Sequence, residues 1–260
     1  MSRAGLYCSM MLALLVGCHA PEGSAPAISQ PAVAYQNSTI DALLDGNFDG
    51  EVSFAEVARH GDFGLGTVNS LDGELIVLGG KFFQVRSDGK AYQVSADAIT
   101  PLAIVTFFRA DAVRKIGEGD YPSLQRQLDE MRPGYGHAFA FSIHGQFESV
   151  KTRSVPRQNK PYVSLAEVVK TQPTFDLKNV TGTLVGFWYP ESMRHVNVPG
   201  YHFHFITDDR TAGGHVLDLS ITRGEASMQE LATVEIALPT LPPATRPTTQ
   251  ASRELEKVEK

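Results

Sequence analysis

Three histidines lie close together in one stretch of the sequence, YHFHFITDDRTAGGHVLD, at residues 201–218. In an extended strand, successive side chains point to opposite faces, so we expect His202 and His204 to share one face of a strand. Imidazoles two residues apart are separated by about 6–7 Å and can bind one metal ion. The spacing of this pair alone is a weak indication of a metal site.

The third histidine strengthens the prediction. Residues 208–214, DDRTAGG, are turn formers, and Gly213 and Gly214 can take positive φ. If the strands on either side form a hairpin, His215 lies across from His204. Three neutral imidazoles with an open fourth position are typical of a catalytic zinc site. The alternative is that these residues are polar side chains on a solvated strand face.

Other features of the chain narrow the choice of partners and ligands. Its two cysteines, Cys8 and Cys18, both precede the expected fold, so a metal site there must use His, Asp or Glu. The net charge is −6 and Lys and Arg do not cluster, which argues against nucleic acid as a partner. Within the expected fold, four other histidines stand alone: His60, His137, His144 and His195.

Residues 45–56, DGNFDGEVSFAE, match the ligand spacing of an EF-hand calcium loop. An EF-hand also needs a helix on each side, and the glycines in RHGDFGLG (59–66) would interrupt the second one. The context therefore favours a turn before a short helix over a calcium site. Ser53 caps this predicted helix, and Glu56 lies in its first turn.

The N-terminus has the order of a secretory signal: an early arginine, an apolar run and small residues. Its end, LVGC (15–18), resembles the lipobox of bacterial lipoproteins. We therefore expect a lipoprotein-type signal peptide at 1–17 and membrane attachment through acylated Cys18, or else an ordinary signal peptide. Either form is exported, as a membrane-anchored or periplasmic protein. Residues 18–34, rich in Ala, Pro and Ser, are expected to be a flexible linker.

Between residues 35 and 238, hydrophobic patterns predict an α+β fold of two mixed or antiparallel β-sheet domains with a few short helices. GELIVLGGKFFQVR (73–86) predicts a hairpin, and YPSLQRQLDEMRP (121–133) predicts an amphipathic helix. SLAEVVKTQ (164–172) predicts a short helix capped by Ser164. GHAFAFSIHGQFESVKTRSV (136–155) predicts two strands around its central HG.

We expect three regions after the linker. An N-terminal α/β sheet domain spans 35–160, and a C-terminal β domain with the zinc site spans 161–238. Residues 239–260 form a Pro/Thr-rich linker and a tail that returns to the active site.

Several blocks, in order along the chain, resemble the signature blocks of acetolactate decarboxylases. They are HGDFGLGTVNSLDGELIVLGGKFFQV, VKTRSV, KPYVSLAEVVKTQPTF, GTLVGFWYP and GYHFHFITDDRTAGGHVLD. The resemblance covers about residues 38–238 and includes the segment that fits a calcium loop, which supports rejecting calcium. It implies an acetolactate decarboxylase fold and a homodimer. It also implies zinc-dependent decarboxylation of (S)-2-acetolactate to (R)-acetoin and CO2, by a carboxy-lyase of the acetoin pathway.

The same resemblance implies roles for individual residues. His202, His204 and His215 match the family's zinc ligands, and Glu74 and Arg153 match its active-site glutamate and arginine. A second family glutamate lies near the C-terminus. The tail RELEKVEK offers Glu254, Glu256 and Glu259, of which the spacing after Leu255 favours Glu259. Thr67 is expected to line the substrate site with Arg153.

These residue types suit the chemistry. Loss of CO2 from a β-keto acid leaves an enediolate, and zinc is a Lewis acid that stabilises its charge. Arg153 can hold the carboxylate through its planar fork. Glu74 or Glu259 can protonate one face of the enediolate as a general acid.

Two other functions use the same histidines. A zinc metallohydrolase would use a three-histidine zinc with a glutamate base, although the chain has no H-E-x-x-H helix. A non-catalytic periplasmic metal-binding lipoprotein would use the metal structurally. The presence of Glu74 and Arg153 favours the decarboxylase over both.

Overall fold

A computed structural model of the chain describes Met1, residues 32–134 and residues 136–239. The described helices and strands all lie in one compact unit, Pro31–Lys260. Its α-helices are short: α1 (Ile40–Leu44), α2 (Phe54–Val57), α3 (Tyr121–Asp129) and α4 (Leu165–Val168). The 3₁₀ turns are η1 (Asn69–Leu71), η2 (Val169–Thr171) and η3 (Glu191–Met193).

The first sheet has seven strands in the order β15-β1-β8-β3-β4-β5-β6. All neighbours are antiparallel except β1 and β15, which are parallel. The strands are β1 (Val33–Asn37), β3 (Phe63–Thr67), β4 (Glu74–Leu78), β5 (Lys81–Val85), β6 (Ala91–Gln93), β8 (Ala103–Thr106) and β15 (Thr233–Ala237). A separate two-stranded sheet pairs β2 (Val52–Ser53) with β7 (Ile99–Thr100).

The second sheet has six antiparallel strands in the order β10-β14-β11-β12-β13, with β9 also paired to β14. They are β9 (Ala112–Ile116), β10 (Gly119–Asp120), β11 (Ala138–Arg153), β12 (Thr174–Tyr189), β13 (Gly200–Thr207) and β14 (Gly213–Leu231). Strand β13 pairs with both β12 and β14, and each of these pairs with β11. The four strands therefore close into a ring, and the closure brings β13 beside β14.

A row of glycines crosses this ring where the strands bend. Gly145 of β11 pairs with Gly182 of β12 on one side and with Gly224 of β14 on the other. A Cβ on Gly182 would lie 2.5 Å from Cζ of Phe205. The missing side chain at Gly182 therefore lets Phe205 pack against the backbone, and those at Gly145 and Gly224 let the two main chains approach each other.

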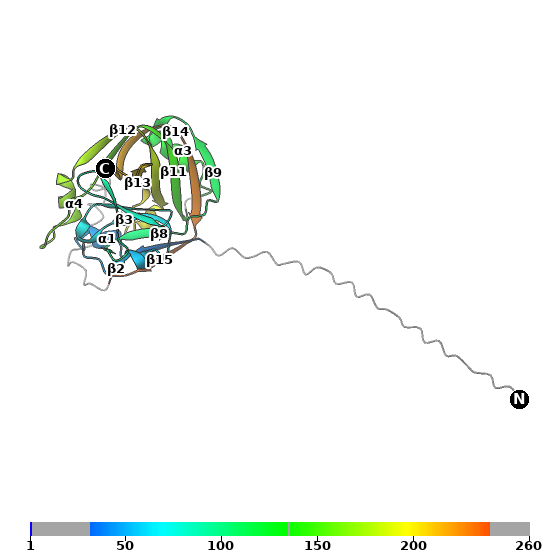
Figure 1. The fold of residues 1–260 in the computed structure, drawn as a ribbon, viewed down its shortest axis with the longest axis horizontal. Coiled ribbons are helices and arrows are strands. Elements are labelled where there is room, and N and C mark those ends of the chain that lie inside the picture. Colours follow the sequence, from blue (N-terminus) through cyan, green and yellow to red (C-terminus); the bar gives the residue numbers. More distant parts are fainter. Residues whose placement is uncertain (2–31, 135, 240–260) are drawn as a thin grey trace. The chain divides into compact units, whose positions relative to one another are not determined.

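The two sheets face each other across a shared apolar core (Figure 1). The first sheet contributes Leu65, Ile76 and Ile104 to this core, and the second contributes Phe187 and Ile206. Helix α3 covers part of the other face of the second sheet through buried Leu124 and Leu128. Helices α1 and α4 pack together in a smaller apolar cluster. The site described below lies between the sheets, beside the shared core.

The structure confirms the predicted α+β class of mixed and antiparallel sheets with short helices. The 73–86 hairpin forms as β4 and β5, and Gly79 and Gly80 between them both have positive φ. Ser53 caps α2 by accepting a hydrogen bond from the main-chain N–H of Glu56 (3.2 Å). The segment that fits an EF-hand thus leads into a capped helix, as interpreted from its sequence.

Three local expectations differ from the structure. Residues 138–153 form one continuous strand, β11, rather than two, because Gly145 stays within the ladder and register shifts follow it. Helix α3 ends at Asp129, before the expected end at Pro133. Pro133 disfavours helical backbone at Arg132, and the chain before it closes with hydrogen bonds three residues back, from Met131 to Leu128 (3.0 Å) and from Arg132 to Asp129 (3.3 Å). Ser164 precedes α4, but its side chain makes no capping hydrogen bond.

The division between the sheets does not coincide with the expected domain boundary at residues 160–161. Strands β9, β10 and β11 precede that point and belong to the second sheet, whereas β15 follows it and belongs to the first. The expected signal peptide, linker and C-terminal tail lie outside the described residues, apart from Met1, residues 32–34 and Pro239. Among the described helices, none is long and apolar enough to cross a membrane.

Candidate metal centre and active site

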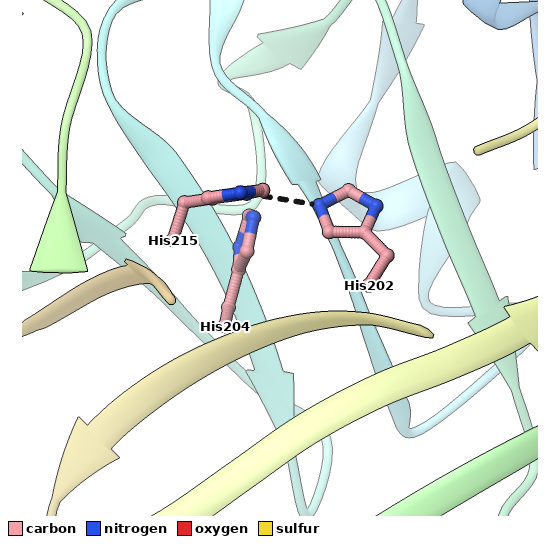
Figure 2. A group of neighbouring side chains, drawn as sticks. All are labelled: His202, His204 and His215. Carbon is pink, nitrogen blue, oxygen red and sulfur yellow. Dashed lines mark hydrogen bonds between the residues drawn. The ribbon is translucent and has the colours of Figure 1, made fainter. Parts of the chain in front are cut away.

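The three histidines of the 201–218 stretch meet at one point between the sheets. His204 of β13 is the direct cross-strand partner of His215 of β14, so the predicted hairpin pairing is present. His202 lies two residues before His204 on the same face. One nitrogen of each ring lies within 4.8 Å of the corresponding nitrogens of the other two. Figure 2 shows the rings pointing toward one another.

Hydrogen bonds orient these rings. The Nδ1–H of His204 donates to the main-chain carbonyl of Leu75 (2.8 Å), which leaves the lone pair of Nε2 directed at the cluster. Nε2 of His202 lies 3.1 Å from Nδ1 of His215. Two zinc–nitrogen bonds of about 2.0–2.1 Å at a tetrahedral angle would place their nitrogens about 3.3 Å apart. The observed separation fits two ligands of one ion.

The protonation states also suit metal binding. Burial, with a smaller contribution from the positive charge of Arg153, lowers the pKa of His202 to about 3. Burial also holds the pKa values of His204 and His215 well below the usual range. Uncharged imidazoles are the form that binds a metal, so the three residues can hold a metal ion at neutral pH.

Arg153 extends the site along the second sheet. It ends β11 and is the direct cross-strand partner of His215, which in turn pairs with His204. Direct cross-strand partners project to the same face of a sheet, so these three side chains form one row across β11, β14 and β13. The row faces β4 of the first sheet.

Glu74, the first residue of β4, completes the polar part of the site. Nη1 of Arg153 donates to Oε1 of Glu74 (3.1 Å), and Oε2 of Glu74 lies 3.5 Å from Nε2 of His204. Both members of the pair are buried, with Arg153 4% and Glu74 5% exposed. A buried cation, a buried carboxylate and three neutral imidazoles therefore share one cavity.

This cavity also has an apolar wall. Its lining includes Thr67, Glu74, Arg153 and the three histidines. It also includes side chains from α1, the η1 turn, β8, α4 and the segment before β13. The apolar members are Ile40, Leu43, Leu65, Leu71, Leu102, Ile104, Val155, Leu165 and Val198. Asn197 is a further polar member. The cavity is therefore charged on one side and hydrophobic on the other.

The structure places the sequence-predicted residues as follows. His202, His204, His215, Glu74 and Arg153 come together in the cavity. Thr67 lines it too, and its hydroxyl donates to the main-chain carbonyl of Gly73 (2.7 Å). Glu259, with the alternatives Glu254 and Glu256, lies outside the described residues.

Sequence reasoning missed most of the apolar wall and Asn197. These residues come from seven separated segments, and hydrophobic periodicity marks the apolar ones only as core positions. Leu75 was also missed, because its contribution is a main-chain carbonyl that any residue type would supply.

Comparison with known proteins identifies the family. The profile of the family described as alpha-acetolactate decarboxylase matches residues 34–243. The chain belongs to this family. An alpha-acetolactate decarboxylase of Methanosarcina mazei is 48% identical over 210 residues, which cover 80% of this chain and 73% of that protein. One of Methylococcus capsulatus is 48% identical over 189 residues, 72% of each chain.

The fold agrees with this membership. The crystal structure of alpha-acetolactate decarboxylase from Bacillus subtilis strain 168 matches with a TM-score of 0.83 and 37% identity, covering 87% of this chain and 99% of that one. Membership confirms the resemblance read from the signature blocks and the prediction of an enzyme of the lyase class.

Proposed function

We propose that this protein is a zinc-dependent enzyme that decarboxylates (S)-2-acetolactate to (R)-acetoin and CO2. The observation that supports it most strongly is the buried Arg153–Glu74 pair (3.1 Å) beside three neutral histidines. A site built only to hold a structural metal does not need a buried cation and carboxylate next to the ligands, because burying charges is costly. These groups match the charges that appear during a decarboxylation.

The cavity suits the substrate in shape and polarity. Acetolactate is a small anion with one carboxylate, one hydroxyl, one ketone and two methyl groups. The guanidinium of Arg153 can bind the carboxylate with charge-assisted hydrogen bonds. The apolar wall, which includes Leu71 and Ile104, can contact the methyl groups.

His202, His204 and His215 are the residues that would hold the zinc ion. A bound zinc ion supplies Lewis-acid stabilisation of the negative charge that develops on the substrate oxygens. The hydrogen bond from His204 to Leu75 keeps one ligand ring in place, which limits reorganisation during the reaction.

The chain's own side chains carry the remaining steps. Arg153 orients the carboxylate before the carbon–carbon bond breaks. CO2 leaves without the bonding electron pair, which stays on the substrate as an enediolate. Glu74, in its protonated form, then delivers its proton to one face of the enediolate carbon and becomes a carboxylate, which takes up a new proton from water before the next turnover. Transfer to one face gives a single enantiomer. Among the described residues, Glu74 is the one carboxylate that lines the cavity.

One assay tests this proposal. The purified, zinc-loaded protein is incubated with racemic acetolactate, and acetoin is measured by chiral gas chromatography. We expect (R)-acetoin from the zinc-loaded protein and almost none after treatment with a chelator. Absence of acetoin from the zinc-loaded protein would refute the proposal. Hydrolysis of ester or amide substrates without decarboxylation would favour a metallohydrolase instead.

We also propose that the protein is exported and attached to a membrane through acylated Cys18, and that it forms a homodimer. The support for export is the signal-like order of residues 1–17 and the LVGC sequence (15–18) at its end. Mass spectrometry of the mature N-terminus tests the acylation, with Cys18→Ala as the comparison. An unmodified Cys18 in the mature protein would contradict membrane attachment. Sedimentation equilibrium tests the dimer.

A further inference from the structure

The turn that leads into Glu74 has an unusual backbone. Ser70 (φ 63°) and Leu71 (φ 53°) both adopt left-handed conformations, as does Gly73 (φ 83°). Residues other than glycine rarely adopt this conformation, and they keep it only where the surrounding structure holds them. The turn places Leu71 in the cavity wall and ends at Glu74.

Side chains from both strands that flank β4 hold this turn. From β3, the hydroxyl of Thr67 donates to the carbonyl of Gly73 (2.7 Å). From β5, Nε2 of Gln84 donates to the carbonyl of Asp72. The two peptide groups just before Glu74 are therefore fixed from opposite sides.

Gln84 cannot act by contacting the substrate. Its direct cross-strand partner is Leu75, whereas the partner of Glu74 is Val85. Because successive side chains alternate, Gln84 and Leu75 project from the face of the sheet opposite to Glu74. Leu75 belongs to the apolar cluster on that far face, away from the cavity.

The carboxamide of Gln84 is nevertheless held in one orientation. Its side chain is 3% exposed, and its Oε1 accepts a hydrogen bond from Nε of Arg86 (3.0 Å). With the oxygen paired to Arg86, the amide N–H points toward the carbonyl of Asp72. A buried amide among apolar neighbours is costly unless it is hydrogen-bonded, so this position serves the turn rather than the core.

We propose that Gln84 is a positioning residue that holds the carboxylate of Glu74 against Arg153 and His204. The proposal rests on the proposed function, because it assumes that Glu74 transfers the proton. Through the carbonyl of Asp72, Gln84 fixes the backbone that carries Glu74. This backbone sets the 3.1 Å contact to Arg153 and the 3.5 Å contact to His204.

The first test replaces Gln84 with Met, which has similar length and no amide. In the full-length zinc-loaded protein we expect kcat to fall by about tenfold or more, because small misplacements of a reacting group are costly. KM should stay within about twofold, because Arg153, which binds the substrate carboxylate, is untouched. The matched control is Gln93→Met at an exposed position of β6, which should leave kcat unchanged. An unchanged kcat in Gln84→Met would overturn the proposal.

A second substitution separates positioning from general loss of structure. Ser70→Gly lets the turn adopt its left-handed backbone without a restraint. It keeps both main-chain bonds of Ser70, to Phe48 (2.8 Å) and to Gln158 (2.8 Å), and removes the hydroxyl that accepts from Tyr162 (3.2 Å) and Asn69 (3.4 Å). In the Gln84→Met background we expect Ser70→Gly to restore at least about half of the lost activity on a logarithmic scale. If the effects of the two substitutions on the logarithm of kcat simply add, Gln84 acts by some other route and the proposal fails.

A milder variant covers the case in which Gln84→Met does not fold. Arg86 is exposed, and Arg86→Met removes the group that orients the Gln84 amide, together with the contact of its guanidinium with the ring of Tyr92 (4.5 Å to the centroid). We expect a smaller fall in kcat, about two- to threefold, against no change in the control Arg59→Met, at an exposed position just after α2. Equal kcat values in Arg86→Met and Arg59→Met would count against the proposal.

Hydrogen exchange provides a readout that does not depend on the reaction. In Gln84→Met or Arg86→Met we expect faster exchange of the amides of residues 70–75 than in the unaltered protein, with other strands unaffected. Unchanged exchange there would overturn the positioning role. If the unaltered protein makes no acetoin but exchange does accelerate, then the proposed function fails while the turn is still held by Gln84.

Discussion

His204 of β13 donates its Nδ1 proton to the main-chain carbonyl of Leu75 on β4, at 2.8 Å. This hydrogen bond joins the two sheets at the centre of the site. The adjacent residue, Glu74, projects from the face of β4 opposite to the Leu75 side chain. Its carboxylate is directed toward Nε2 of the same imidazole. This contact thus holds the row of Arg153, His215 and His204 on one sheet in register with the Glu74 carboxylate on the other.

Removal of one imidazole should abolish both metal binding and activity. In His204→Ala we expect less than stoichiometric zinc by elemental analysis and no measurable acetoin, because two ligands hold zinc far more weakly than three. The matched control is His144→Ala, since His144 is an exposed histidine on β11. Full activity in His204→Ala would refute its assignment as a ligand.

Removal of the metal should lower thermal stability. A ligand that binds only the folded state at about 100 times its Kd stabilises that state by about 2.7 kcal/mol. For a protein of this size, that corresponds to an increase in Tm of about 5–10 °C. Calorimetry of the apo and zinc-loaded protein measures it. His204→Ala should show no such increase, and an equal increase there would place the zinc elsewhere.

Arg153→Lys tests the role of the guanidinium fork. Lysine keeps the charge but cannot donate two parallel hydrogen bonds to a carboxylate. Loss of one hydrogen bond to a charged group costs about 1.5–3 kcal/mol, so kcat/KM should fall by about 10- to 150-fold. Steady-state kinetics measures this, and zinc content should be unchanged. Activity equal to that of the unaltered protein would mean that Arg153 does not bind the carboxylate.

Glu74→Gln tests the proton donor. Glutamine keeps the shape and a hydrogen-bonding oxygen for Arg153 but cannot deliver a proton in the same way. General acid catalysis contributes roughly 10²–10⁴-fold, so we expect kcat to fall by that amount. The comparison is Glu259→Gln, with Glu254→Gln and Glu256→Gln beside it. If Glu259→Gln gives the larger fall and an acetoin product of lower enantiomeric purity, the C-terminal glutamate is the donor.

Gly214→Ala tests the backbone approach that aligns β14 with β11. Gly214 has φ +133°, and a Cβ there would lie 2.5 Å from the carbonyl oxygen of Arg153. We expect a loss of at least about 1–3 kcal/mol in the free energy of unfolding, together with weaker zinc binding, because the clash displaces His215. Gly80→Ala is the control: its φ is +72° with no atom near the added Cβ. It should lose about 1–2 kcal/mol but retain its zinc affinity.

Much of the site could be predicted from local sequence. Alternation along a strand places His202 and His204 on one face, and the glycine-bearing turn pairs His215 with His204; the structure shows both. The β4–β5 hairpin and the Ser53 cap follow from equally local rules. Such features depend only on residues that are close together in the chain, so local sequence is enough to predict them.

Longer elements were predicted less well. The sequence around Gly145 indicates a break, yet β11 continues through it because its neighbours β12 and β14 carry glycines at the paired positions. The residue pattern of one strand does not show which residues the neighbouring strands carry at the paired positions. For the same reason, the membership of β9, β10 and β11 in the second sheet could not be read from chain order.

By itself, the sequence determined which residues could do chemistry: three histidines in a hairpin, Glu74 after one turn and Arg153 at the end of a strand. Only the tertiary structure decided that Arg153, His215 and His204 form one row across three strands, with Glu74 facing it from the other sheet. It also decided that Gln84, on the far face, holds the turn before Glu74. The reason is physical: strand pairing and sheet packing join residues far apart in the chain, and these contacts depend on the closure of the whole fold.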